Sequence, residues 1–142
     1  MHVVDAKLAH FHALIVQPWQ RAHADLLRDD RYLADLLAHG PAWAVLDGDY
    51  VLCVGGALDK GGGRAECWAW LTGELGNRML TVHRAALRFL NSVPFRRLEM
   101  YVHEKHWQCI RWACALHFQL ECQRLASWFE DGSAAMLFAR VR

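Results

Sequence analysis

The order of predicted elements between Pro41 and Phe118 constrains the fold of this chain more than any other feature. Two β-rich runs flank an Asp-Gly turn, which is a strong hairpin signal. The strands are expected at 43–46, 50–54, 65–71, 98–103, 120–129 and 134–141, and the main helices at 78–93 and 105–117. This order predicts an α/β (α+β) protein with a mixed, mostly antiparallel sheet and helices on both of its faces.

The first forty residues are predicted to be mostly helical. Residues 1–6 favour a short first strand, and apolar residues at helical spacing then predict helices over 7–16 and 19–39. The second helix is expected to break near 29–30, where two aspartates adjoin. The Gly-Gly pair at 55–56, inside a strand-forming run, predicts a β-bulge.

The composition fits one folded domain, 1–142, with a well-buried core. A net charge of +1 does not favour binding of the whole molecule to nucleic acid or membrane. The five cysteines are odd in number and lack C-x-x-C spacing, so we expect reduced, mostly buried thiols. No signal peptide is visible, and no apolar stretch approaches the ~20 residues that span a bilayer. These features predict a protein of a reducing cytoplasm, or of an assembly formed there, without a membrane partner.

The order of elements resembles the GNAT acetyltransferase family over nearly the whole chain, with a gap expected between the strands 65–71 and 98–103. The loop that joins a strand to the best helix reads Leu71-Thr72-Gly73-Glu74-Leu75-Gly76-Asn77-Arg78. In the family, this turn binds the pyrophosphate of coenzyme A through backbone N–H groups at a helix N-terminus. The resemblance therefore implies acetyl-CoA as a cofactor, and it implies four residues that would hold it: Thr72, Gly73, Gly76 and Asn77.

The loop departs from the family pattern, which is Arg or Gln, two residues, Gly, any residue, then Gly or Ala. Leu71, Glu74 and Gly76 stand at the three key positions, and only Gly76 matches. Glu74 would add a repulsion of roughly 4 kcal/mol per charge pair at ~4 Å from the pyrophosphate, as an upper bound. The same carboxylate near a helix start stabilises the empty helix. We therefore expect no cofactor, or only weak binding of acetyl-CoA.

The general acid of the family is also missing. It is a tyrosine four residues before a Gly-Phe pair; here His117-Phe118 takes the place of the pair and Ala113 that of the tyrosine. Alanine cannot donate a proton, and the indole N–H of neighbouring Trp112 is only very weakly acidic. No catalytic residue is predicted. Three carboxylates are possible general bases, with nothing in the sequence to rank them: Glu66, Glu99 and Glu104.

Several segments resemble small GNAT-like proteins encoded among the head genes of tailed bacteriophages. These segments are 40–45, 54–56, 68–71 and 95–99. The plan is also similar to that of an internal virion protein of short-tailed coliphages, which keeps this fold without clear acetyl transfer. The resemblance implies a virion structural or assembly protein that acts by docking to portal, head or tail proteins in multiple copies. Its location would be the virion, and the host cytoplasm during assembly.

An enzyme is the alternative: a divergent acetyl-CoA-dependent N-acetyltransferase acting on a host protein or a small molecule. The two hypotheses differ in what the surface must do, because a docking protein needs exposed anchors. The chain has seven tryptophans, and 13 arginines against three lysines. Trp and Arg are enriched at interfaces and dominate their energetics. The candidate interface residues are Arg84, Arg88, Arg96, Arg97, Trp107 and Trp112.

Other interpretations of these residues stay open. A solvated helix face explains the arginines, and a basic stripe would suit DNA phosphates in a packaging accessory. The run His103-x-x-His106-x-x-Cys109 has metal-compatible residue types but no fourth ligand, so no metal site is predicted. Cys109 or Cys114 as a nucleophile would need an activating base, and core packing is the simpler interpretation.

Overall fold

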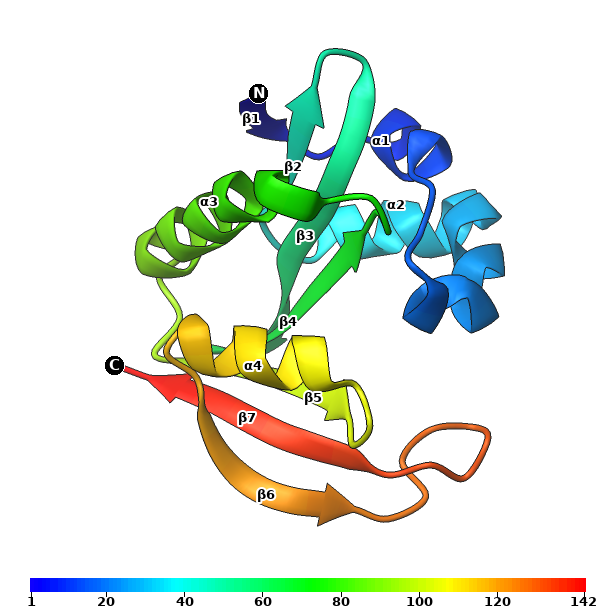
Figure 1. Ribbon diagram of the computed structural model, residues 1–142. Coiled ribbons are helices and arrows are strands. Elements are labelled where there is room, and N and C mark those ends of the chain that lie inside the picture. Colours follow the sequence, from blue (N-terminus) through cyan, green and yellow to red (C-terminus); the bar gives the residue numbers. More distant parts are fainter. The chain divides into compact units, whose positions relative to one another are not determined.

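The computed structural model describes residues 1–142 and forms a seven-stranded sheet with helices (Figure 1). In chain order the elements are β1 His2–Asp5, α1 Leu8–Ala13, η1 Pro18–Arg28, α2 Asp30–Ala38, β2 Ala42–Asp47, β3 Tyr50–Gly61, β4 Arg64–Leu71, η2 Gly76–Arg78, α3 Met79–Ser92, β5 Arg97–His103, α4 Trp107–Ala115, β6 Gln119–Leu125 and β7 Ala135–Val141. The strand order is β1-β2-β3-β4-β5-β7-β6. The pair β4–β5 is parallel, and the pairs β1–β2, β2–β3, β5–β7 and β6–β7 are antiparallel. The predicted mixed, mostly antiparallel α/β architecture is confirmed.

The chain divides into two compact units. The N-terminal unit contains residues 1–59 and 68–93, and the C-terminal unit contains residues 60–67 and 94–142. Strand β4 contributes to both, because the division falls inside it. A single domain over 1–142 stays a prediction. No helix is both long and apolar enough to cross a membrane.

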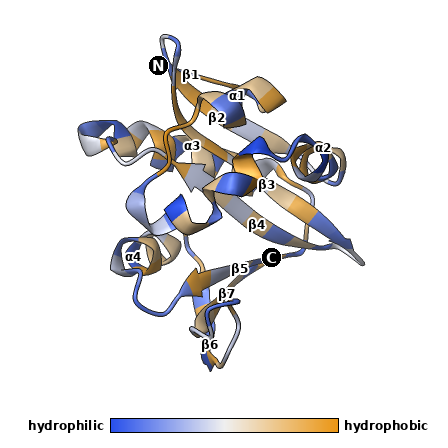
Figure 2. Ribbon diagram, turned by 90° about the vertical axis from the view of Figure 1, so that its right-hand side faces the viewer, coloured by the Kyte–Doolittle hydropathy of each residue, from blue (hydrophilic) through white to orange (hydrophobic).

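The core of the N-terminal unit forms where α1 and α2 cover β2–β4. Four of its residues are fully buried: Phe11 and Leu33 on the helices, and Ala44 and Val54 on the strands. The strands β2 and β3 carry much of the hydrophobic colour in Figure 2. Helical spacing of the apolar residues in α1 and α2 places them on the face that packs on the sheet.

The sequence predicted an α-helix from residue 19, but the segment between α1 and α2 is a 3₁₀ helix, η1, of 11 residues. Pro18 at its first position lacks an N–H to donate, and Leu27 is its one buried residue. The predicted interruption near 29–30 is confirmed: Asp29 caps α2 by accepting a hydrogen bond from the Tyr32 N–H at 3.1 Å.

The predicted bulge at Gly55-Gly56 is wrong. Both glycines pair regularly with β2, and the register instead shifts between Val45 and Leu46. The glycines are needed for a different reason. A Cβ atom on Gly55 would lie 2.8 Å from the ring of Trp43, and one on Gly56 would lie 2.6 Å from the ring of Trp68. The two indoles lie directly on the backbone of β3. This strand continues to Gly61 instead of ending near residue 54 as predicted.

The C-terminal unit packs around Leu98, Val102 and Phe138, each at most 2% exposed. Its last hairpin is shorter than predicted, because β6 ends at Leu125 rather than near 129. Ser127 then adopts φ of 52°, which turns the chain out of the strand. The loop brings two aromatic rings back onto β5: Trp128 stacks on Tyr101 at 4.4 Å and Phe129 on His103 at 5.4 Å between ring centroids.

We expect Gly56→Ala to lower the free energy of unfolding by about 1–3 kcal/mol, because its Cβ would overlap the Trp68 ring and the Pro41 carbonyl oxygen, 2.8 Å away. Urea unfolding followed by tryptophan fluorescence measures the change. Gly73→Ala is the matched control, because the atoms nearest to its Cβ lie at 3.6 Å, an ordinary contact. Equal midpoints for both variants would show that the indoles do not require a bare β3 backbone.

Candidate functional site

The loop between β4 and α3 lies wholly within the N-terminal unit. Gly76 opens η2 with φ of +50°, a conformation that glycine adopts without steric cost. The chain then continues without a break into α3, a helix of 14 residues. Of the four candidate cofactor-binding residues, Gly73, Gly76 and Asn77 are exposed. The loop therefore presents backbone to solvent at a helix N-terminus, the arrangement that binds anions.

Thr72, the fourth candidate, faces the interior. It is 2% exposed, and its hydroxyl lies 3.0 Å from the hydroxyl of Tyr50. Its N–H donates to the carbonyl of Leu52 at 3.0 Å, which continues the pairing of β4 with β3. The Thr72 side chain therefore anchors the loop instead of presenting a group to a ligand.

Arg78 supports this loop, a role that its place in the sequence does not indicate. Its guanidinium donates to the Asp47 carboxylate at 3.3 Å and to the Glu74 carbonyl oxygen, and it lies 5.5 Å above the Tyr50 ring. These contacts place a cation beside the loop and fix the backbone around Glu74. The cation comes from the first turn of the helix, not from the Leu71 position, where the family pattern has Arg or Gln and where the leucine is buried.

The edge of β4 away from β3 is occupied by the start of η1 and the residue before it. The side chain of Gln20 donates to the Ala69 carbonyl at 2.7 Å and accepts from the Leu71 N–H at 3.0 Å. The Gln17 N–H donates to the Leu71 carbonyl at 2.9 Å, beside an isolated bridge between Val16 and Thr72. The sequence around Gln20 does not indicate that its side chain bonds to β4, because these contacts join residues about fifty positions apart.

Pairing between β4 and β5 involves the opposite end of β4. It joins Arg64–Glu66 with Arg97–Glu99, the first residues of each strand. The edge at Ala69–Leu71 has Gln20 and Gln17 as partners instead. Beyond Glu66, the outer edge of β4 therefore bonds to the N-terminal segment of its own unit.

The position of the missing general acid is a packing position here. Ala113 is fully buried in α4, and Phe118 is 4% exposed. His117 adopts φ of 65°, the left-handed conformation that glycine favours. His117, at the place of the glycine in the family pattern, thus has a backbone conformation in which a glycine would be unstrained.

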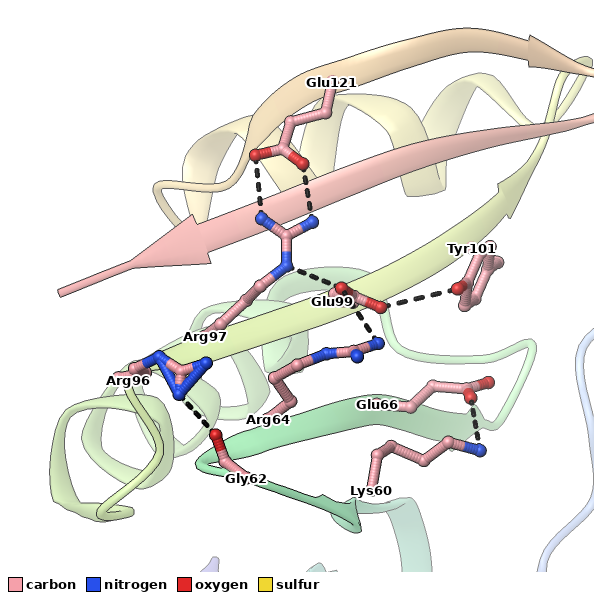
Figure 3. Close-up of polar contacts among 9 residues, drawn as sticks. All are labelled: Lys60, Gly62, Arg64, Glu66, Arg96, Arg97, Glu99, Tyr101 and Glu121. Atoms are coloured by element: carbon pink, nitrogen blue, oxygen red, sulfur yellow. Dashed lines mark hydrogen bonds and ion pairs between the residues drawn. The ribbon is translucent and has the colours of Figure 1, made fainter.

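The structure separates the three possible general bases. The oxygens of Glu99, which is 8% exposed, accept from Arg97 Nε at 2.6 Å and from the Tyr101 hydroxyl at 3.4 Å, and Arg64 lies 3.7 Å away (Figure 3). Glu66 and Glu104 make only longer ion pairs with Lys60 and Arg124, at 3.7 and 3.6 Å. Glu99 is the least accessible of the three to a ligand, because it is nearly buried and its oxygens already accept hydrogen bonds.

Arg97 is the centre of this polar network. It also forms two hydrogen bonds with Glu121, at 2.9 and 2.6 Å (Figure 3). These bonds are the main cause of the lowered pKa of the Glu121 carboxyl. The pKa of Tyr101 is raised, first by burial and then by the nearby Glu99 charge. The network ties β4, β5 and β6 together on one face of the C-terminal unit.

The candidate interface residues fall in both units. Arg84 and Arg88 are exposed on α3 in the N-terminal unit. In the C-terminal unit Arg96 donates to the Gly62 carbonyl, while Arg97 belongs to the network above. Trp107, at the start of α4, is 70% exposed, whereas Trp112 is half-buried. Of the aromatic candidates, only Trp107 presents most of its ring to solvent.

The histidines and cysteines do not gather into a metal-binding group of three or more. His103 accepts a hydrogen bond from the Lys105 N–H at 3.1 Å, and burial lowers the pKa of His106. Burial raises the pKa of the Cys109 thiol to about 11, which disfavours the reactive thiolate. All five cysteines are free, as expected, but the expectation that most are buried is wrong. Only Cys53 is fully buried, Cys114 is exposed, and the other three are partly exposed.

Comparison with known proteins gives a likeness in structure alone. No family model and no curated protein matches the sequence. Among solved structures, the chain is similar to an IAA acetyltransferase from Bacillus cereus, with a TM-score of 0.71, 12% identity and coverage of 99% of each chain. It is also similar to a Bacillus subtilis acetyltransferase solved with CoA, with a TM-score of 0.72, 11% identity and coverage of 99% of this chain and 98% of that one. A third similar structure is a ribosomal-protein-S5-alanine acetyltransferase from Vibrio fischeri. Its TM-score is 0.68 and its identity 12%, and the match covers 98% of this chain and 91% of that one. The chain has the fold of the GNAT acetyltransferases.

Proposed function

We propose that this protein is a divergent N-acetyltransferase that holds acetyl-CoA loosely at the loop 72–78. One observation carries the proposal: exposed backbone at the start of α3, opened by Gly76 at φ of +50°, on a fold shared with acetyltransferases. The enzyme, which was the alternative from the sequence, is thus the main proposal, and docking in a virion is the second candidate. The exposed loop gives the diphosphate of a cofactor a place to bind, and Arg78 supplies a cation near it.

The charge of the loop is mixed, which favours weak binding. Glu74 is exposed and four positions before Arg78, whose guanidinium is shared with Asp47. The helix N–H groups and the partly neutralised Arg78 would attract a diphosphate, and the Glu74 carboxylate would repel it. The balance permits binding without making it strong.

Acetyl transfer can proceed without the missing tyrosine. The amine nitrogen bonds to the thioester carbonyl carbon, the C–S bond breaks, and the proton lost by the amine equals the proton gained by the thiolate. Ala113 cannot deliver that proton, so water or the amine itself would. General acid–base catalysis contributes roughly 10²–10⁴-fold, so its loss lowers the rate without abolishing transfer.

We expect acetyl-CoA to bind with a dissociation constant of about 0.1–1 mM, or about −4 to −5.5 kcal/mol. Isothermal titration calorimetry measures it. Gly76→Val should remove binding, because a β-branched residue resists the left-handed conformation that opens η2. The absence of binding to the unaltered protein at cofactor concentrations of about 5 mM would overturn the proposed function.

Glu74→Gly should tighten the binding of acetyl-CoA about tenfold, by removing a repulsive charge from the loop. Glu74→Gln separates the effect of charge from that of backbone freedom, and Glu130→Gly is a control at another exposed glutamate. Weaker binding by Glu74→Gly would mean that the loop is aligned wrongly with the family pattern.

A docking role in a phage virion is the second candidate, and exposed tryptophans favour it. Trp107 is 70% exposed and Trp128 is 47% exposed. Large exposed aromatic rings are typical anchors of interfaces, where truncation costs ~2 kcal/mol or more. The portal, head or tail partners and a contact with DNA phosphates stay proposals of the same kind.

For this second role we expect mass spectrometry of purified virions to find the protein at a fixed stoichiometry. We expect Trp107→Ala to reduce the amount of the protein in the virion. Trp112→Ala is the control, since that ring is half-buried. Virions without the protein, together with acetyl transfer by the isolated chain, would leave only the enzyme.

A further inference from the structure

The edge of β4 at Ala69–Leu71 is closed by the Gln20 side chain and by one main-chain bond, from the Gln17 N–H to the Leu71 carbonyl, rather than by a strand. Unpaired strand edges bind extended chains through their free N–H and C=O groups. Here the Gln20 amide donates to the Ala69 carbonyl at 2.7 Å and accepts from the Leu71 N–H at 3.0 Å. One primary amide therefore makes the two hydrogen bonds that a neighbouring strand would make.

The segment that carries this amide also touches the cofactor loop. The Cα of Gln17 and the Cδ of Pro18 both lie 3.6 Å from the position of a Cβ on Gly73. The Gln17 side chain donates to Gln20 Oε1 at 3.2 Å and so orients the amide. Residues 17–28, which we name the strap, thus lie against both β4 and the loop that follows it.

The strap is held by few contacts of the core. Its 3₁₀ conformation runs over 11 residues, whereas such segments rarely exceed 3–4. Leu27 is its one buried side chain, and most of the others are exposed. Residues 17–20, its first part, include no buried side chain, so their movement would break the bond from the Gln17 N–H to the Leu71 carbonyl, at 2.9 Å, without removing a buried side chain from the core.

We propose that Gln20 is an internal competitor that closes the β4 edge, and that the strap must move before an extended amide chain can bind there. The ligand rests on the proposed function: the arm of acyl-CoA between its diphosphate and its thioester carries two amide groups. A diphosphate at the loop 72–78 would put that arm next to Leu71, the residue before the loop. Binding then requires a minor, open conformation, so the apparent affinity falls by the fraction of molecules that are open.

Gln20→Ala tests the proposal through two measurements on the full chain. The first needs no ligand: hydrogen exchange at the Leu71 N–H should accelerate about tenfold, while the Val54 N–H in the core is unchanged. The second is calorimetric titration, in which CoA should bind about tenfold more tightly than to the unaltered protein. Gln20→Met keeps the length of the side chain without its amide and should give the same results. Gln108→Ala, at an exposed glutamine of α4, should change neither measurement.

The outcomes separate this inference from the proposed function. Unchanged exchange at Leu71 overturns the inference, whatever the cofactor does. Faster exchange with equal CoA affinity shows that Gln20 does not compete, and leaves the acetyltransferase standing. If CoA binds neither variant, the proposed function fails, and the competition fails with it. Faster exchange together with tighter binding supports both.

Discussion

The hydrogen bonds of the β4 backbone are the constraint on which much of this structure depends. A strand inside a sheet must pair on both edges, because buried N–H and C=O groups without partners are costly. β4 meets this requirement with different partners along its length. Arg64–Glu66 pair with β5, while Ala69 and Leu71 bond to Gln20 and Gln17. Bonds from Gln17 and Gln20 thus take the place of a neighbouring strand along the second half of β4.

Packing accounts for two departures of this chain from the family pattern. A buried Leu71 removes a polar side chain from the loop, and Gln20 brings an amide to the backbone of the same residue. Ala113 removes a proton donor and fills a fully buried position. Each departure has a packing explanation as well as a functional one. A shared fold does not by itself decide between them, because function depends on the groups at the site.

The sequence predicted the elements well and their partners poorly. The helix at 78–93 and the strand at 98–103 were expected from apolar spacing alone, and α3 and β5 confirm them. The glycines 55–56 were mistaken for a bulge, since no local pattern reveals that the rings of Trp43 and Trp68 lie over them. Of the candidate loop residues, the structure exposes three and turns Thr72 toward Tyr50.

The sequence by itself determined the order of strands and helices, the turns between them and the departures of the loop from the family pattern. These depend on residues that are neighbours along the chain, where period and turn chemistry act. Only the tertiary structure decided that Gln20 closes β4, that Arg78 supports the loop, and that Arg97 joins Glu99 to Glu121. The first two contacts join residues 49 and 31 positions apart, and the bond from Arg97 to Glu121 spans 24. Such contacts form only when packing brings distant segments together, and no local pattern encodes them.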